Sequence, residues 1–282
     1  MRVTTLVEND RLEGCEDVEA SFGLSVHVET QDARILFDAG PSRVVVDNAE
    51  ALGIDLAQVD AAVLSHQHFD HGGGLEAFLE VNDRATVYLR DCPIRQRTAK
   101  ALAVIKRSVG IDPQLVERFK DRFEFVSGQR EIAPDVHLVT EIGDEFDRPR
   151  GNKILFAETD EGLKPDPFDH ELVMVVAEEG RLVVFTGCSH NGILNMVGAA
   201  ATAFPGVPVG AVFGGFHLIG LPFYDSMSAS RREVLSIGER LAELVQGTVY
   251  SGHCTGNKAD TVLKEVMGDQ LDRIRTGSMT EV

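Results

Sequence analysis

The sequence predicts a mixed α/β (α+β) fold, a four-layer αββα sandwich in which two β-sheets pack face to face and helices cover their outer faces. The chain opens with alternating apolar runs typical of strands, and then alternates strand patterns with helix patterns. The same order returns in the second half. Two halves that each mix hairpins with strand–helix units favour two packed sheets over one doubly wound parallel sheet.

In the first half, strands are predicted in RVTTLVE, LSVHVET, ARILFDAG, VDAAVLSH and ATVYLR, and helical spacing occurs in SRVVVDNAEALGI and LEAFLE. Residues 93–122 have the pattern of a helical stretch. Residues 143–169 are rich in Asp, Glu, Pro and Gly, which is typical of a long loop, either ordered near the site or a mobile lid. We therefore expect a helical and loop insertion at about 92–168 near the active site.

Further strands are predicted in FEFVSG, DVHLVTEI and KILFAE, and those of the second half in ELVMVVAE, RLVVFTG, VGAVFGG and TVYSGH. Helices are expected at about 191–203, 228–245 and 257–266. The chain shows no strong linker, short repeat or low-complexity segment, so we expect residues 1–282 to form a single domain.

The net charge of −18 is spread over the whole chain and argues against a nucleic-acid groove, which needs a basic stripe. A small anionic substrate stays open, because bound cations can dominate the charge of a pocket. The sequence has neither a signal-peptide pattern nor a stretch of about 20 apolar residues that would span a bilayer. We expect a cytoplasmic protein with reduced cysteines, a small-molecule substrate and no nucleic-acid or membrane partner, and we leave the oligomeric state open.

Four metal-competent side chains occur within six consecutive residues, in the segment HQHFDH at the end of a predicted buried strand. In an extended segment alternate residues face the same way, so His66, His68 and Asp70 converge while His71, across the turn, addresses a neighbouring point. That geometry suits two metal ions. Imidazole nitrogen and carboxylate oxygen are donors typical of zinc, non-haem iron or manganese. We expect two zinc ions, with manganese or iron as the other metals that these donors suit.

The segment HQHFDH followed by GGGL resembles the HxHxDH signature of the metallo-β-lactamase superfamily. The segments ILFDAG, TGCSHNGILN, GGFHL and SGHCTG recur in the expected order, and the resemblance covers residues 1–260. It implies the metallo-β-lactamase fold. With LVEND and FGLS, these motifs look most like the branch that contains 7,8-dihydropterin-6-methyl-4-(β-D-ribofuranosyl)aminobenzene-5'-phosphate synthase, an enzyme linked to methanopterin biosynthesis.

The resemblance also implies metal ligands. His66 and His68 would hold the first metal, Asp70 and His71 the second, and His253 in SGHCTG would complete the second site.

The second half departs from the superfamily pattern at the turn where an aspartate commonly bridges both metals. This chain has Cys188 there, in TGCSH. A thiolate is itself a metal ligand, but we prefer His190, two residues on, as the missing ligand of the first site. His170, which precedes a predicted strand, competes for that role. The histidine that is not a ligand would support the site by hydrogen bonding or contact the substrate.

Further residues are assigned to the substrate. His217 follows a buried strand and a glycine pair, and we assign it to substrate binding or proton transfer. Glu8 and Asn9 resemble the family's residues beside the pocket. Relatives tend to carry histidine where this chain has Phe22, so that position has no assigned role here.

These assignments predict a metal-dependent hydrolase that uses a metal-activated water on a small metabolite, phosphorylated or carbonyl-containing, with Asp70 and His217 as the catalytic residues. The first alternative is a transferase that joins a pterin methyl group to an aminobenzene ribofuranosyl phosphate. The second is an iron-dependent oxidoreductase. The third, from a different class, is a non-catalytic metal-stabilised binding module.

Overall fold

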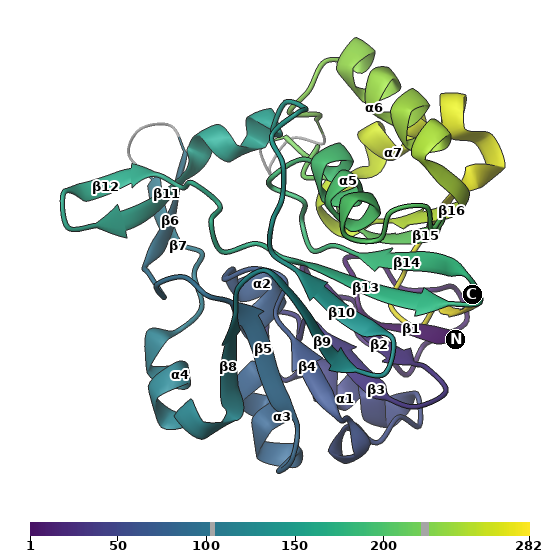
Figure 1. Ribbon diagram of the computed structural model, residues 1–282. Helices are drawn as coiled ribbons and strands as arrows, with labels where there is room; N and C mark the ends of the chain where they lie inside the picture. Colours follow the sequence, from purple (N-terminus) through teal and green to yellow (C-terminus); the bar gives the residue numbers. More distant parts are fainter. Residues whose placement is uncertain (102–104, 221–225) are drawn as a thin grey trace. The chain divides into compact units, whose positions relative to one another are not determined.

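The computed structural model describes residues 1–101, 105–220 and 226–282, and these residues form two compact units (Figure 1). Unit 1 comprises Met1–Val126, Ile154–His170 and Arg275–Val282, and unit 2 comprises Ser127–Lys153 and Glu171–Ile274. Each unit therefore combines stretches that lie far apart in the sequence. The mixed α/β class is confirmed, and the expectation of a single domain stays a prediction.

The larger sheet of unit 1 has seven strands in the order β18-β1-β2-β3-β4-β5-β8. The first four strands of this order pair antiparallel, and β3, β4, β5 and β8 pair parallel. Parallel strands end at the same edge, so the segments that follow β3 and β4 leave the sheet side by side. The strands are β1 (Arg2–Val7), β2 (Ser25–Glu29), β3 (Arg34–Phe37), β4 (Ala61–Val63), β5 (Thr86–Arg90), β8 (Phe123–Val126) and β18 (Met279–Glu281).

The helices of unit 1 cover one face of this sheet. Alternate strand residues such as Leu36, Ala62 and Val87 form a buried cluster with Val45 and Phe78 from the helices. Because burial of such side chains supplies about 1.5–3 kcal/mol each, this cluster holds the sheet and its loops in place. The helices are α1 (Val44–Ala51), η1 (Leu56–Gln58), α2 (Phe69–Gly72), α3 (Leu75–Val81), α4 (Pro113–Arg118) and η2 (Lys120–Arg122).

A second sheet of unit 1 replaces most of the helix expected over residues 93–122, so that expectation is wrong. Strands β6 (Arg97–Ala101) and β7 (Ile105–Ser108) form a hairpin, and helix begins only at Pro113. The run is rich in Arg, Lys and Ala, which favour helix, but Ala99 pairs with Leu155 of β11. A partner 56 positions away overrides a weak local preference. Residues 102–104 lie outside the described residues.

The segment 143–169, expected as a long loop, contains the 3-10 helix η3 (Arg150–Ile154) and a second hairpin. The strand expected in KILFAE is confirmed as β11 (Leu155–Thr159), and it pairs with β12 (Gly162–Pro165). The order of this sheet is β12-β11-β6-β7.

Unit 2 has one seven-stranded sheet in the order β17-β16-β15-β14-β13-β10-β9. Strands β14 to β17 pair parallel, so the turns after β14, β15 and β16 leave one edge. The strands are β9 (Gln129–Ala133), β10 (Val136–Val139), β13 (Val173–Glu178), β14 (Arg181–Phe185), β15 (Val209–Gly214), β16 (Val245–Ser251) and β17 (Leu271–Arg273).

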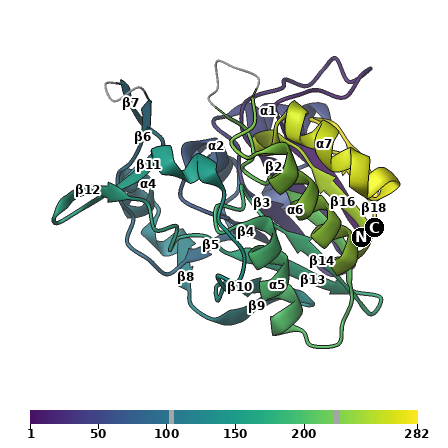
Figure 2. The ribbon, with the colours of Figure 1, turned by 90° about the horizontal axis from the view of Figure 1, so that it is seen from above.

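Three helices of unit 2 pack on one face of this sheet, where they bury residues such as Met196, Val234 and Leu263 against Val184 and Val212. Figure 2 shows α6 and α7 side by side, and a Cβ added at Gly238 of α6 would lie 2.6 Å from Val266 of α7. The helices expected at about 191–203, 228–245 and 257–266 are confirmed as α5 (Ile193–Ala203), α6 (Arg231–Leu244) and α7 (Asn257–Met267). The 3-10 helix η5 (Gly268–Gln270) follows α7.

Among the described residues, we find no helix whose length and apolar character would let it cross a membrane.

Candidate metal centre

The segment after β4 gathers the four metal-competent residues of the HQHFDH motif. His66, His68, Asp70 and His71 are all buried, and His68 is the extended residue before the short helix α2. The ring centroid of His66 lies 4.6 Å from that of His68 and 4.2 Å from that of His71. His66 Nε2 and His68 Nδ1 are 3.1 Å apart. The expected convergence of His66 with His68 is therefore present within unit 1. Asp70 Oδ2 lies 3.9 Å from His71 Nε2, so Asp70 lies beside His71.

Asp38, which follows β3, anchors this segment and was missed in the sequence. Its carboxylate accepts hydrogen bonds from the backbone N–H and the hydroxyl of Ser65, each at 2.8 Å. The second carboxylate oxygen also lies 2.6 Å from His71 Nδ1. A carboxylate at Nδ1 favours the tautomer with the proton there, which leaves Nε2 as the nitrogen for metal binding. The parallel pairing of β3 with β4 was the one signal that could have indicated this contact.

The electrostatics of the segment favour neutral imidazole. Burial lowers the pKa of His68 well below its usual value, and the nearby His170 lowers it further. Neutral imidazole is the form that binds a metal ion. Buried imidazoles with a carboxylate beside them therefore fit a divalent cation.

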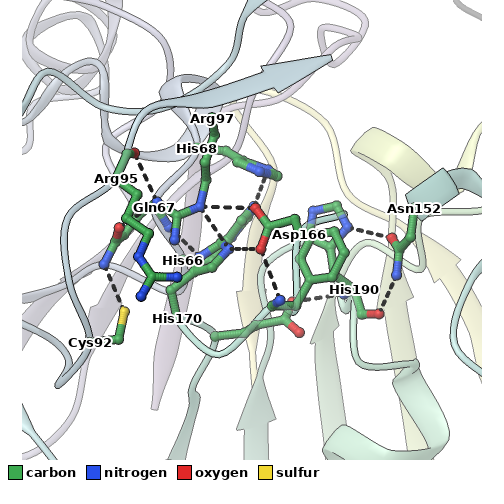
Figure 3. Close-up of polar contacts among 12 residues, drawn as sticks. His66, Gln67, His68, Cys92, Arg95, Arg97, Asn152, Asp166, His170 and His190 are labelled. Carbon is green, nitrogen blue, oxygen red and sulfur yellow. Dashed lines mark hydrogen bonds and ion pairs between the residues drawn. The ribbon is translucent and has the colours of Figure 1, made fainter. Parts of the chain in front are cut away.

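A buried polar network lies behind the motif in unit 1 (Figure 3). The backbone N–H of Gln67 donates to His170 Nδ1 at 3.0 Å, and Arg97 Nε lies 3.0 Å from both His170 Nε2 and Asp166 Oδ2. Arg97 Nη1 also donates to Gln67 Oε1 at 2.6 Å. Both ring nitrogens of His170 are thus engaged within this network. That arrangement supports the preference for His190 over His170 as a ligand.

The charges of this network are matched. Burial opposes ionisation of Asp166, yet the hydrogen bond from His170 and the Arg97 charge hold the pKa of Asp166 well below its usual range. His68, Asp166 and His170 each offer a donor atom within 4.8 Å of the others. The Arg97 guanidinium already places a positive charge against Asp166. A metal ion is therefore not needed to balance the negative charge of this group of three residues.

The turn after β14 carries the corresponding residues of unit 2. Cys188, His190 and His217 each place a donor atom within 4.8 Å of the others. Asn152 Oδ1 lies 2.9 Å from His190 Nδ1, and Asn152 Nδ2 donates to the His190 carbonyl at 2.8 Å (Figure 3). Because Asn152 holds Nδ1, Nε2 is the nitrogen of His190 that is placed to bind a metal.

Glu171 braces the same turn. Its carboxylate accepts hydrogen bonds from the backbone N–H groups of His190 and Asn191, both at 2.8 Å. Burial raises the pKa of Glu171, although these hydrogen bonds oppose the rise. Asn152 and Glu171 lie 38 and 19 positions from His190, and no sequence pattern links them to it.

Three residues of unit 2 beside these groups hold left-handed backbone conformations. The φ angles are 57° at Ser189, 49° at His217 and 51° at His253. Each costs about 1 kcal/mol or more in a residue with a side chain, and such strain concentrates at functional sites. His253 begins the 3-10 helix η4 (His253–Thr255) after β16, as a ligand at a strand end should.

Cys254, beside His253, was not singled out in the sequence. The backbone N–H of His217 donates to its sulfur at 3.3 Å. Burial opposes ionisation of this thiol, but hydrogen bonds from Cys188 and His217 hold the pKa of Cys254 well below its usual value. The thiol therefore belongs to the polar surroundings of His217.

Glu8 and Asn9 hold turns within unit 1. Glu8 Oε2 accepts from the backbone N–H of Asp10 at 2.6 Å, and Asn9 Oδ1 accepts from that of Gly23 at 3.3 Å. The next residue, Leu24, donates to the Asp70 carbonyl at 3.1 Å. These residues thus support the segment beside the motif, and their assignment to substrate stays a prediction.

Comparison with known proteins adds to this geometry. A family model described as the metallo-β-lactamase superfamily matches residues 18–91, which include the HQHFDH motif. The 7,8-dihydropterin-6-methyl-4-(β-D-ribofuranosyl)-aminobenzene-5'-phosphate synthase of Methanocaldococcus jannaschii is 26% identical over 279 residues, 91% of this chain and 88% of that protein.

Two solved structures extend the comparison. A metal-dependent hydrolase of the β-lactamase superfamily is 30% identical with a TM-score of 0.83, and the match covers 100% of this chain and 99% of that one. Zinc-bound PqqB from Methylobacterium extorquens has a TM-score of 0.57 at 11% identity, with 100% of both chains covered, and shares the fold.

Proposed function

Because the chain belongs to the metallo-β-lactamase superfamily, we propose that it is a metal-dependent hydrolase of a small, phosphorylated metabolite. The observation that carries this proposal is the buried convergence of His66, His68, Asp70 and His71, with His71 held by Asp38 at 2.6 Å. Side chains of this kind are rarely buried together unless they are hydrogen-bonded or bind a cation.

We propose six metal ligands and two zinc ions. The ligands are His66, His68, Asp70 and His71 of unit 1 and His190 and His253 of unit 2. When bound, a divalent cation supplies Lewis-acid chemistry, since it lowers the pKa of water towards neutrality and polarises a substrate oxygen.

The chain's own residues prepare this chemistry. Asp38 and Asn152 orient His71 and His190, each through a contact at Nδ1. Asp70 and His217 are the groups that we assign to proton handling, and His217 holds a left-handed backbone conformation. No protein nucleophile is needed in this assignment.

The test combines metal content with turnover. The purified protein is analysed by mass spectrometry for zinc, manganese and iron and assayed on a panel of phosphate monoesters and diesters. We expect His68→Ala to lose metal and turnover while its circular dichroism spectrum is unchanged. His137→Ala, which alters a histidine of strand β10 whose ring packs on Phe204, is the matched control. Full turnover by His68→Ala would refute the proposal.

A transferase is the second candidate, and the relative named as a synthase favours it. The protein is incubated with a pterin pyrophosphate, with and without the arylamine. Release of pyrophosphate only when both are present indicates transfer, and release without the amine indicates hydrolysis.

The same samples test the two remaining alternatives. Zinc as the only bound metal removes the iron-dependent oxidoreductase. A binding module would keep its ligand affinity in His68→Ala and would show no turnover on any substrate of the panel.

A further inference from the structure

A cavity of about 590 Å³ opens on unit 2 beside the turn that carries His190. Its walls are the loop 146–150, the first turn of α5, Phe216 and one face of α6. We call it the arginine pocket, because Arg148, Arg150 and Arg240 line it. Its volume suits a small molecule, for which pockets of about 300–1,000 Å³ are usual.

The loop wall of the arginine pocket is held in place before any ligand binds. Asn195 of α5 accepts a hydrogen bond from the backbone N–H of Phe146 at 2.9 Å and donates one to its carbonyl at 2.8 Å. Gly192 has a φ of 90°, and a Cβ there would lie 3.1 Å from the Asp147 carbonyl oxygen. Only glycine permits this approach of loop and helix without strain. A preformed pocket spares a ligand part of the entropic cost of ordering the site.

The helix wall presents one face of α6. Glu233, Ser236, Ile237 and Arg240 follow the spacing i, i+3, i+4, i+7, so their side chains share a stripe along the helix. Together with Phe146, Ile193, Leu194 and Phe216 from the other walls, Ile237 gives the pocket an apolar lining next to its charges.

The charge of the pocket opposes that of the chain. Its lining contains three arginines and two acidic residues, Asp147 and Glu233, in a protein of net charge −18. The first turn of α5 also lines the pocket, and it contains no acidic residue and no side-chain cap. The unsatisfied N–H groups of a helix start add a partial positive charge.

The ion pairs that Arg150 and Arg240 make with carboxylates are weak enough for a bound phosphate to replace them. Arg240 contacts Glu243 at 3.1 Å, with side chains 59% and 66% exposed, and Arg150 contacts Glu233 at 2.5 Å. Exposed pairs of this kind contribute only about 0–1 kcal/mol. A phosphate dianion accepts paired hydrogen bonds from guanidinium and therefore competes well for these side chains.

We propose that the arginine pocket binds the phosphate group of a small molecule whose apolar body rests on Phe146 and Ile237. As a substrate subsite this rests on the proposed function, because Phe216 immediately precedes His217 and Gly192 follows His190 by two residues. The pocket thereby defines the substrate class as a molecule with an apolar or aromatic group and a phosphate that anchors it in the pocket and is not itself the group hydrolysed.

The test measures binding of phenylphosphonate, a phosphate mimic that is not hydrolysed, by calorimetry on the purified protein. We expect Arg148→Gln and Arg240→Gln each to weaken binding about tenfold, the usual value of one charge-assisted hydrogen bond. Arg231→Gln is the matched control, because Arg231 lies on the same helix and contacts Glu265 but does not line the pocket. Benzoate in place of phenylphosphonate compares carboxylate with phosphate, and we expect it to bind more weakly.

Two further results separate this inference from the proposed function. His68→Ala should bind phenylphosphonate as the wild type does. If the wild type does not bind, or if the pocket variants match Arg231→Gln, the pocket assignment is wrong. Loss of binding in His68→Ala with full binding in Arg148→Gln and Arg240→Gln places the anion at the metal ligands, which overturns the pocket and leaves the proposed function standing.

Discussion

The backbone N–H of Gln67 donates a hydrogen bond to Nδ1 of His170, 103 positions further along the chain. Gln67 stands between two proposed ligands, so the direction of its N–H depends on the same backbone that aims His66 and His68. Arg97, which is only 1% exposed, contacts both His170 and Gln67 and so links these two residues a second time. His170, the competitor of His190 for the first metal site, thus contacts the segment that carries the proposed ligands.

Replacement of this support should weaken metal binding without abolishing it. We expect His170→Ala to reduce zinc affinity about 10–100-fold, the usual effect of losing a group that orients ligands. Competition with a chromophoric chelator measures the zinc affinity. We expect His68→Ala to lose far more zinc affinity than His170→Ala does. Affinity equal to that of the wild type would show that the Gln67 segment holds its conformation without His170.

Asp38 should affect both stability and metal binding. Asp38→Ala leaves the buried N–H of Ser65 and Nδ1 of His71 without this acceptor, so we expect the free energy of unfolding of the chelator-treated protein to fall by about 2–3 kcal/mol. Urea denaturation measures this. Asp38→Asn, which keeps one acceptor oxygen, should recover part of the stability but not the zinc affinity. Equal zinc affinity in Asp38→Asn and the wild type would contradict the role assigned to the carboxylate.

His27 should make the protein less stable in acid. Burial lowers its pKa from 6.5 to about 4, and neither ring nitrogen has a hydrogen-bond partner among the described residues. Between those values the unfolded chain binds the extra proton and the folded chain does not, so stability falls as the pH decreases from about 6.5 to 4. At pH 7 the effect vanishes.

The variant His27→Gln isolates this effect. Between pH 7 and pH 4.5 we expect the wild type to lose about 2 kcal/mol more of its free energy of unfolding than the variant does. Urea titrations at the two pH values provide the comparison, and parallel pH profiles for the two proteins would contradict it.

Cys188 stands where the superfamily commonly has a bridging aspartate. Without a bridging carboxylate we expect the wild type to bind the second of its two metal ions weakly and to keep about one ion per chain under limiting zinc. We expect Cys188→Asp to keep nearer two, because carboxylate is a better bridging ligand for zinc or manganese. Metal analysis after dialysis against limiting zinc decides between these values. Cys188→Ser controls for loss of the thiol alone and should not gain metal.

The sequence predicted those helices and strands whose conformation follows from the apolar spacing within the segment itself. The helices at α5, α6 and α7 and the buried strands around them follow from apolar spacing within each segment. Arg97–Ala101 was missed as a strand because its conformation depends on pairing with β11, and β18 was missed because three residues carry too little pattern. Sequence spacing cannot reveal a partner on a distant strand.

The site divides in the same way. The proposed ligands in HQHFDH were predictable because they lie together in the sequence. Asp38 contacts His71 of this motif across 33 positions, and Asn152 and Glu171 contact His190 across 38 and 19 positions. Each of the three is a common polar residue in an unremarkable segment. The metal-competent residue types were visible in the sequence, and the contacts that orient their side chains were not.

The pairing of β1 with β18 has a consequence for folding. Val3 pairs with Thr280, 277 positions further along the chain, so this edge of β1 stays uncovered in any folding intermediate in which β18 has not yet paired. An uncovered strand edge can pair with other chains. Such intermediates are therefore exposed to misassociation until β18 joins the sheet.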